Sequence, residues 1–178
     1  MASAVNELKS LIPPARAALP ELDWSDVERQ LALLLPLDYK RLVETYGQGS
    51  FDGFLWVLQP SDRNENLDLV RQHRARLSAL RTLHESGEEV PFGVEESAEE
   101  LVPWAITDNG DVCYWVISTS DDPDKWAVAV NEARGPRWKS FELSSSEFLV
   151  ALLSGDLSVE FFPDDFPSDS PIFDAVTT

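Results

Sequence analysis

Hydrophobic positions at helical spacing dominate the first fifty residues. The apolar residues between 5 and 12 recur at this spacing until a Pro-Pro pair interrupts them, so we expect a short first helix. Ser25 and Glu28 have the spacing of a capping box, which predicts a second helix over residues 26–34. A third helix is predicted over residues 36–46, because a proline opens this segment and a glycine follows it.

The middle of the chain has the short β-branched and aromatic runs that are typical of strands. We expect a buried strand over residues 51–58, FDGFLWVL. The apolar stripe between residues 67 and 84 returns to helical spacing and predicts a longer helix. Four further β-prone runs follow, at residues 104–107, 112–118, 126–130 and 138–141. An Asn-Gly pair between the first two is a strong hairpin signal, so we expect an antiparallel meander.

The end of the chain combines a well-specified helix with a tail. Ser144 and Glu147 have capping-box spacing and Gly155 follows the apolar run, so a final helix is predicted over residues 145–154. Residues 156–178 hold four Phe, three Pro and only acidic charges. We interpret them as an extended tail whose aromatic side chains are available for docking.

Helices followed by a strand meander predict a single α+β domain, in which helices flank one curved antiparallel sheet. The length of 178 residues suits one domain with a tail. We expect an N-terminal helical extension over residues 1–20, the domain over residues 21–155, and an acidic tail rich in Phe and Pro over residues 156–178.

The charge of the chain is strongly negative and unevenly distributed. Asp and Glu number 32 against 14 Lys and Arg, which gives a net charge of −18. This field repels phosphate backbones and anionic membranes and attracts cations, so we expect neither direct nucleic-acid binding nor membrane binding. Acidity that only keeps the protein soluble explains the net charge equally well. Residues 85–124 and 140–178 contain no Lys or Arg.

The residue types needed for metal or cofactor chemistry are scarce. The chain has two His and one Cys, and it lacks the HExxH, CxxC, GxxxxGK[ST] and GxGxxG patterns. Cys113 lies in a predicted strand, where the role of a small buried hydrophobic residue is favoured over that of a catalytic thiol. The acidic turns at 108–111 and 121–124 lack the full ligand pattern of a calcium loop. We therefore expect no cofactor, no metal and no catalysis.

The cysteine content and the short apolar runs bear on the cellular compartment in which the protein is expected. A single cysteine excludes an intramolecular disulfide and suits a reducing environment. The first residues lack the pattern of a signal peptide, and the longest purely apolar run, residues 31–35, is too short to span a bilayer. We expect a cytoplasmic protein.

Several short motifs occur in a fixed order along the chain. They are WSDVE at 24–28, LPLDY at 35–39, YGQGSF at 46–51, PWA at 103–105, DNGD at 108–111 and DPDKW at 122–126. No single string is specific, but the ordered series resembles SUKH domains, the superfamily that contains fungal cell-wall synthesis regulators and bacterial toxin-immunity proteins. The resemblance covers roughly residues 22–153.

The resemblance implies an α+β fold and a protein that binds and neutralises a toxin or acts as an adaptor, and it does not imply catalysis. The matched residues are mostly apolar or turn-forming, so we interpret them as determinants of the fold. They are Trp24, Tyr39, Tyr46, Gly47, Gly49 and Trp104.

The first functional hypothesis is an immunity protein whose acidic surface meets a cationic toxin domain, for example a nuclease. The candidate partner-binding acids are Glu95, Glu96, Glu99, Glu100, Asp108, Asp111, Asp121, Asp122 and Asp124. Trp115, Trp126 and Trp138 are candidate anchors if they point outward, and core residues if they do not. We expect a monomer or a weak homodimer.

The second hypothesis is an adaptor or regulatory subunit of a larger complex. In this case the segment from Phe161 to Phe173 acts as the recognition segment for another protein. An enzyme is a third hypothesis, which no constellation of residues supports.

Overall fold

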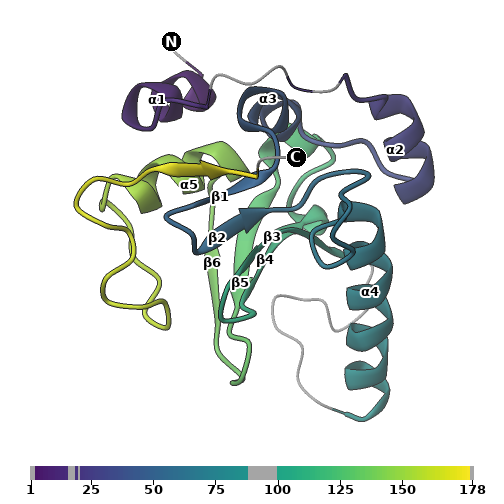
Figure 1. Ribbon diagram of the computed structural model, residues 1–178. Helices are drawn as coiled ribbons and strands as arrows, with labels where there is room; N and C mark the ends of the chain where they lie inside the picture. The colour runs from purple at the N-terminus through teal and green to yellow at the C-terminus, as the bar shows by residue number, and fades with distance from the viewer. Residues whose placement is uncertain (1–2, 16–18, 20, 88–99, 177–178) are drawn as a thin grey trace.

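The computed structural model describes residues 3–15, 19, 21–87 and 100–176 (Figure 1). In this part of the chain the helices are α1 (Ala4–Leu11), α2 (Trp24–Leu31), α3 (Leu37–Tyr46), α4 (Leu69–Glu85) and α5 (Ser145–Leu153), with short 3-10 turns η2 (Ile117–Thr119) and η3 (Pro123–Lys125). The strands are β1 (Gly49–Phe51), β2 (Leu55–Val57), β3 (Leu101–Thr107), β4 (Val112–Val116), β5 (Ala127–Asn131), β6 (Trp138–Phe141) and β7 (Phe173–Ala175).

The strands form one antiparallel sheet in the order β6-β5-β4-β3-β2-β1-β7. Strands β1 to β6 follow one another as a meander. The chain then passes through α5 and returns to the opposite edge of the sheet, where β7 pairs with β1 (Figure 1). The prediction of a single α+β domain with helices around an antiparallel sheet is therefore confirmed.

The central strands are buried on both faces of the sheet. On one face, Trp115 belongs to the larger core, which also contains side chains of α1, α2, α3 and α5. On the other face, Tyr114 belongs to a smaller cluster with Leu80 of α4. Because successive side chains of a strand point to opposite faces, Tyr114 and Trp115 contribute to different cores.

Residues 51–58 form a hairpin, and not the single strand that was predicted. The N–H of Phe54 donates to the carbonyl of Phe51 across a distance of 3.0 Å and closes a tight turn. The turn residues Asp52 and Gly53 both have positive φ, of 52° and 63°. Asp and Gly tolerate this conformation better than most residues, so the Asp-Gly pair divides the apolar run into β1 and β2.

Helix α2 begins with a different cap from the one predicted. The carboxylate of Asp23 accepts a hydrogen bond from the N–H of Asp26 at 3.2 Å, so Asp23 and not Ser25 is the N-cap. The Glu28 side chain accepts from the N–H of Leu35 at 2.9 Å, beyond the end of the helix. The predicted capping box is therefore wrong, although the helix itself is present.

The C-terminal segment packs on the domain. Val159 and Phe162 belong to the larger core, with 4% and 7% of their surface exposed. The Phe162 ring centroid lies 5.4 Å from that of Phe54, and the Phe173 centroid lies 5.1 Å from that of Phe51. These aromatic side chains complete the protein's own core, which corrects the hypothesis that they are free to act as a recognition segment for another protein.

One carboxylate fastens this segment to the β1–β2 turn. The two oxygens of Asp52 accept hydrogen bonds from the N–H groups of Ser168 and Ile172, at 2.9 and 2.8 Å. The Asp52 N–H in turn donates to the carbonyl of Ile172 at 2.9 Å. Helix α1 is also part of the same body, because Val5 and Leu8 belong to the larger core.

His73 of α4 is a titrating group at a partly buried position. Its Nδ1 atom has no hydrogen-bond partner among the described residues. Burial, and to a smaller extent the Arg74 guanidinium, hold the pKa of His73 below its ordinary value of 6.5. The unfolded chain therefore binds this proton more readily than the folded chain, and the free energy of unfolding is expected to fall as the pH drops below about 6.5.

Urea unfolding of the wild type and of His73→Gln, measured between pH 7 and about pH 5, tests this expectation. Gln carries no titrating group, so the variant is expected to lose less stability than the wild type over this interval. An equal loss in the two proteins would contradict the assignment to His73.

Candidate partner-binding surface

The acidic residues proposed from the sequence do not form one surface. Asp108 and Asp111 flank the β3–β4 turn, whereas residues 121–124 follow the other end of β4. Strand β4 has five residues. At about 3.4 Å per residue, the four steps between its end residues span roughly 14 Å. The two acidic turns therefore lie at opposite ends of the sheet.

Asp111 and Asp124 accept hydrogen bonds that hold the fold together. Asp111 is buried, with 3% of its surface exposed, and its carboxylate accepts hydrogen bonds from the Thr107 hydroxyl at 2.8 Å and the Ala133 N–H at 2.9 Å. The prediction that Asp111 contacts a partner is corrected by this burial. The exposed Asp124 carboxylate accepts from the N–H of Leu37 at 2.5 Å, and so satisfies a free backbone donor at the start of α3.

The other candidate acids differ in their surroundings. Asp108, Asp121 and Asp122 are exposed, and Glu100, next to β3, is partly exposed. The Asp108 carboxylate accepts a hydrogen bond from the indole N–H of Trp56 at 2.9 Å. Three of the predicted residues lie outside the described part of the chain, namely Glu95, Glu96 and Glu99.

Trp115 and Trp126 lie in the core. Trp115 is fully buried and Trp126 has 5% of its surface exposed, with the two ring centroids 6.2 Å apart. The Trp126 indole N–H donates to the carbonyl of Ser120 at 2.8 Å. The prediction that these two residues anchor a partner is therefore wrong, and the alternative of core packing is confirmed. Trp138 is partly exposed and packs against Tyr114, with ring centroids 5.6 Å apart.

The described residues do not assemble a reactive cysteine or a metal centre. Cys113 is fully buried, as expected for a small hydrophobic residue. Burial, reinforced by the Asp111 carboxylate, raises the pKa of the Cys113 thiol, so the thiol stays protonated at neutral pH. Among the described residues, no three His, Cys, Asp or Glu side chains are placed to hold a metal ion.

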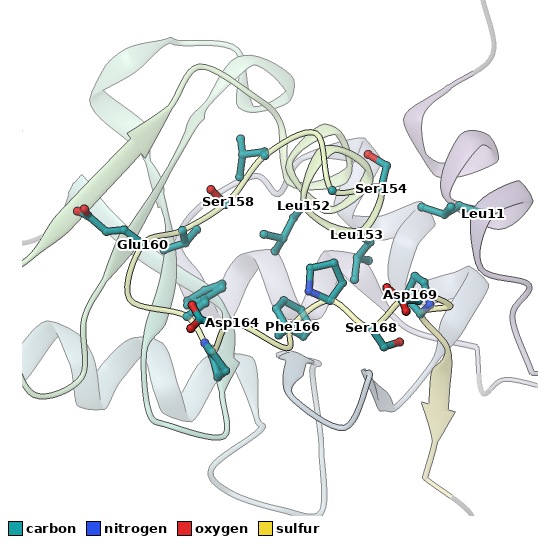
Figure 2. Close-up of a pocket in the computed structure, with 17 residues that line it drawn as sticks. Leu11, Leu152, Leu153, Ser154, Ser158, Glu160, Asp164, Phe166, Ser168 and Asp169 are labelled. Carbon is teal, nitrogen blue, oxygen red and sulfur yellow. The ribbon is translucent and has the colours of Figure 1, made fainter.

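A half-open hollow of about 630 Å³ lies between the end of α5 and the C-terminal segment (Figure 2). Residues 152–155 form one wall and residues between 157 and 171 form the other. Leu11 of α1 borders the hollow from a third side. We call this feature the tail hollow. The contact of the C-terminal segment with the domain creates it.

The tail hollow has an apolar floor and an acidic rim. Leu153 and Phe162 line its buried part, and the exposed residues Glu160, Asp164 and Asp169 line its rim. Figure 2 shows Glu160 and Asp169 on opposite sides of the hollow, with Leu153 between them. The lining contains no Lys, Arg or His among the described residues. Its chemistry suits a ligand that is apolar at its centre and cationic at its edges.

Sequence reasoning did not find this hollow, because the return of the chain from residue 156 onwards to β1 was not predicted. The composition of the C-terminal segment does contain one signal that this segment packs on the domain. Residues 140–178 hold eight acidic residues, six Phe and no Lys or Arg. Such a combination of aromatic side chains with charge of one sign favours a packed segment with an acidic outer surface over a solvated tail.

Comparison with known proteins identifies the domain. The family model SUKH_6, described as SMI1-KNR4 cell-wall, matches residues 21–149, which is 129 of the 178 residues. A search of curated proteins found no match. Within the described ranges, no helix combines the length and the apolar character needed to cross a membrane. The match leaves out α1 and all residues that line the tail hollow. The chain therefore belongs to the SMI1-KNR4 cell-wall family of the SUKH superfamily.

Proposed function

We propose that the protein is a non-enzymatic, cytoplasmic protein-binding module, and specifically an immunity protein that binds and neutralises a cationic toxin domain. One observation carries this proposal. The last 39 residues, 140–178, hold eight acids and no Lys or Arg, and all eight acids are exposed. An acidic surface of this kind accelerates encounter with a basic partner and disfavours anionic ones. Membership of a superfamily that includes toxin-immunity proteins supports the same conclusion.

The acid-rich stretch between residues 85 and 124 contributes to the same attraction in this proposal. Its exposed acids Asp108 and Asp121 lie at opposite ends of β4. In this proposal we assign them to long-range steering of the partner. We assign the same role to Glu95, Glu96, Glu99 and Glu100.

Co-expression tests the function. The gene beside that of this protein is expected to encode a toxin with a basic domain, and cells that produce this toxin are expected to survive only when the protein is produced with it. A neighbouring gene that encodes no toxin, or a toxin that kills cells equally with and without the protein, would count against the immunity role.

Reversing the charge of four glutamates tests whether acidic residues speed the association with the toxin. Changing Glu95, Glu96, Glu99 and Glu100 to Lys moves the net charge from −18 to −10, since each change adds two units. At low ionic strength the association rate constant with the toxin is expected to fall about tenfold, with little change in the dissociation rate. Stopped-flow fluorescence measures both rates.

The same measurement at about 1 M salt provides the control, because a Debye length of about 3 Å suppresses long-range attraction. Wild type and variant are expected to associate at similar rates there. Equal association rates at low salt would remove the electrostatic part of the proposal and leave the immunity role to be judged by co-expression.

A further inference from the structure

We propose that the tail hollow is the docking site for a partner segment that presents a large apolar side chain flanked by Lys or Arg. This inference rests on the proposed function and specifies where the partner makes contact. It places the contact outside residues 21–149, in the part of the chain that the family match does not cover.

The hollow offers accessible apolar surface. Its volume of about 630 Å³ falls within the range of about 300 to 1,000 Å³ that is typical of ligand-binding hollows. Leu11 on α1 has 38% of its surface exposed, and Leu157 and Phe166 on the opposite wall are partly exposed. Burial of these side chains by an apolar group removes their surface from water, which favours occupation of the hollow.

The rim charges are not neutralised from within. Asp164 and Asp169 form no ion pair with any residue that the structure describes. Glu160 has Arg137 nearby, but this guanidinium donates two hydrogen bonds to Glu132, at 2.9 and 2.5 Å. The rim therefore keeps its negative charge for an external cation.

The walls of the hollow are also held in place before binding. Ser168, which lines the hollow, donates its backbone N–H to the carboxylate of Asp52 at 2.9 Å. On the other wall, Leu152 and Leu153 belong to the larger core. A preformed site loses little conformational entropy when its ligand binds.

Charge selects among the occupants that fit this space. A second copy of the chain that docks rim to rim brings the same acidic residues and is repelled, and an anionic ligand is repelled for the same reason. A neutral organic molecule leaves the rim carboxylates without partners. A cationic and apolar segment of a partner protein satisfies both the floor and the rim.

A defined peptide tests the site on the full chain. The probe is a fluorescein-labelled peptide with the sequence Lys-Lys-Leu-Phe-Leu-Lys-Lys, and its affinity is measured by fluorescence anisotropy at low ionic strength. A matched peptide with Glu in place of each Lys is expected not to bind. A third peptide, with Gly-Ser-Gly in place of Leu-Phe-Leu, is expected to bind at least about tenfold more weakly, because it has no side chain for the floor.

Two pairs of protein variants assign the binding to the hollow. The double change Asp164→Asn and Asp169→Asn is expected to weaken binding about fivefold, whereas Asp121→Asn and Asp174→Asn, with the same change in charge at exposed acids elsewhere, is expected to have little effect. Likewise, Leu11→Ser is expected to weaken binding about fivefold, and Leu34→Ser, at a residue 66% exposed and outside the hollow, is expected to leave it unchanged.

The outcomes separate the inference from the proposed function. No binding of the Lys peptide, equal effects of the two Asp pairs, or equal effects of the two Leu variants would overturn the assignment of the hollow. If in addition the Leu11→Ser variant still protects cells from the toxin and binds it as tightly as the wild type, the immunity role stands and only the hollow is excluded. If the wild type itself gives no protection, the proposed function fails.

Discussion

Deletion of residues 156–178 is expected to lower the free energy of unfolding by about 3–5 kcal/mol, a large part of the 5–15 kcal/mol that is typical of a domain. The deletion removes Val159 and Phe162 from the larger core and takes β7 from the edge of the sheet. Leu152, Leu153 and Phe54 lose their cover as a result. Urea unfolding followed by tryptophan fluorescence measures the change.

Two substitutions in the full chain separate the loss of packing from the loss of length. Phe162→Ala is expected to lower the free energy of unfolding by about 3 kcal/mol, because it leaves a cavity in the core. Asp165→Ala, at an exposed position three residues away, is expected to change it by less than about 0.5 kcal/mol. A truncated chain that unfolds at the same urea concentration as the wild type would show that the segment is not part of the folded core.

Trp115→Ala is expected to lower the free energy of unfolding by about 3–5 kcal/mol, as large-to-small changes of buried aromatic residues do. Trp115 is fully buried, and its ring centroid lies 4.9 Å from that of Tyr39 and 6.2 Å from that of Trp104. Removing the indole therefore leaves a cavity between the sheet and α3. Denaturant unfolding and the thermal midpoint report the loss.

Trp115→Phe is the matched variant, and it is expected to cost less. It keeps an aromatic ring, and it removes an indole N–H that has no hydrogen-bond partner among the described residues. Loss of such an unpaired buried group offsets part of the lost packing, by about 1–3 kcal/mol. Affinity for the toxin is expected to stay unchanged. A stable Trp115→Phe protein that no longer binds would instead indicate that Trp115 contacts the partner.

The elements that the sequence predicts well are those with a complete local signal. Helix α5 has its N-cap at Ser144, and Glu147 closes the capping box, as its spacing predicts. The β3–β4 hairpin forms around the Asn109-Gly110 pair. In both cases the residues that decide the structure lie within a few positions of one another. A short stretch of sequence therefore contains all the residues of the cap or of the turn.

The elements that the sequence predicts poorly depend on competing or distant partners. Ser25 and Glu28 have the spacing of a cap, but Asp23 caps the helix and Glu28 instead satisfies the N–H of Leu35. The Asp52-Gly53 pair was hidden within an apolar run that also suits one continuous strand. In each case the local sequence suits two different arrangements, and packing against the rest of the domain selects one of them.

The candidate partner-binding surface depends even more on contacts between residues that are distant in the sequence. The amino-acid composition shows that the protein is acidic, but it contains no information on how far apart the acidic side chains lie in space. A carboxylate that satisfies two donors, such as Asp111, cannot be distinguished in the sequence from an exposed one such as Asp121. The tail hollow requires Asp52 to meet Ser168, more than a hundred positions away, and local patterns contain no information about such a meeting.

The pairing of β7 with β1 has a consequence for the protein during its synthesis. Gly49 to Phe51 leave the ribosome well before their partners Phe173 to Ala175, which lie more than a hundred positions later in the chain. Until then the β1 edge lacks its neighbour and the core lacks Val159 and Phe162. A nascent chain therefore exposes an open strand edge beside apolar surface, which is the combination that promotes aggregation. We expect a chain that stops near residue 155 to aggregate more readily during synthesis than the full chain, because it never gains the segment that covers this edge.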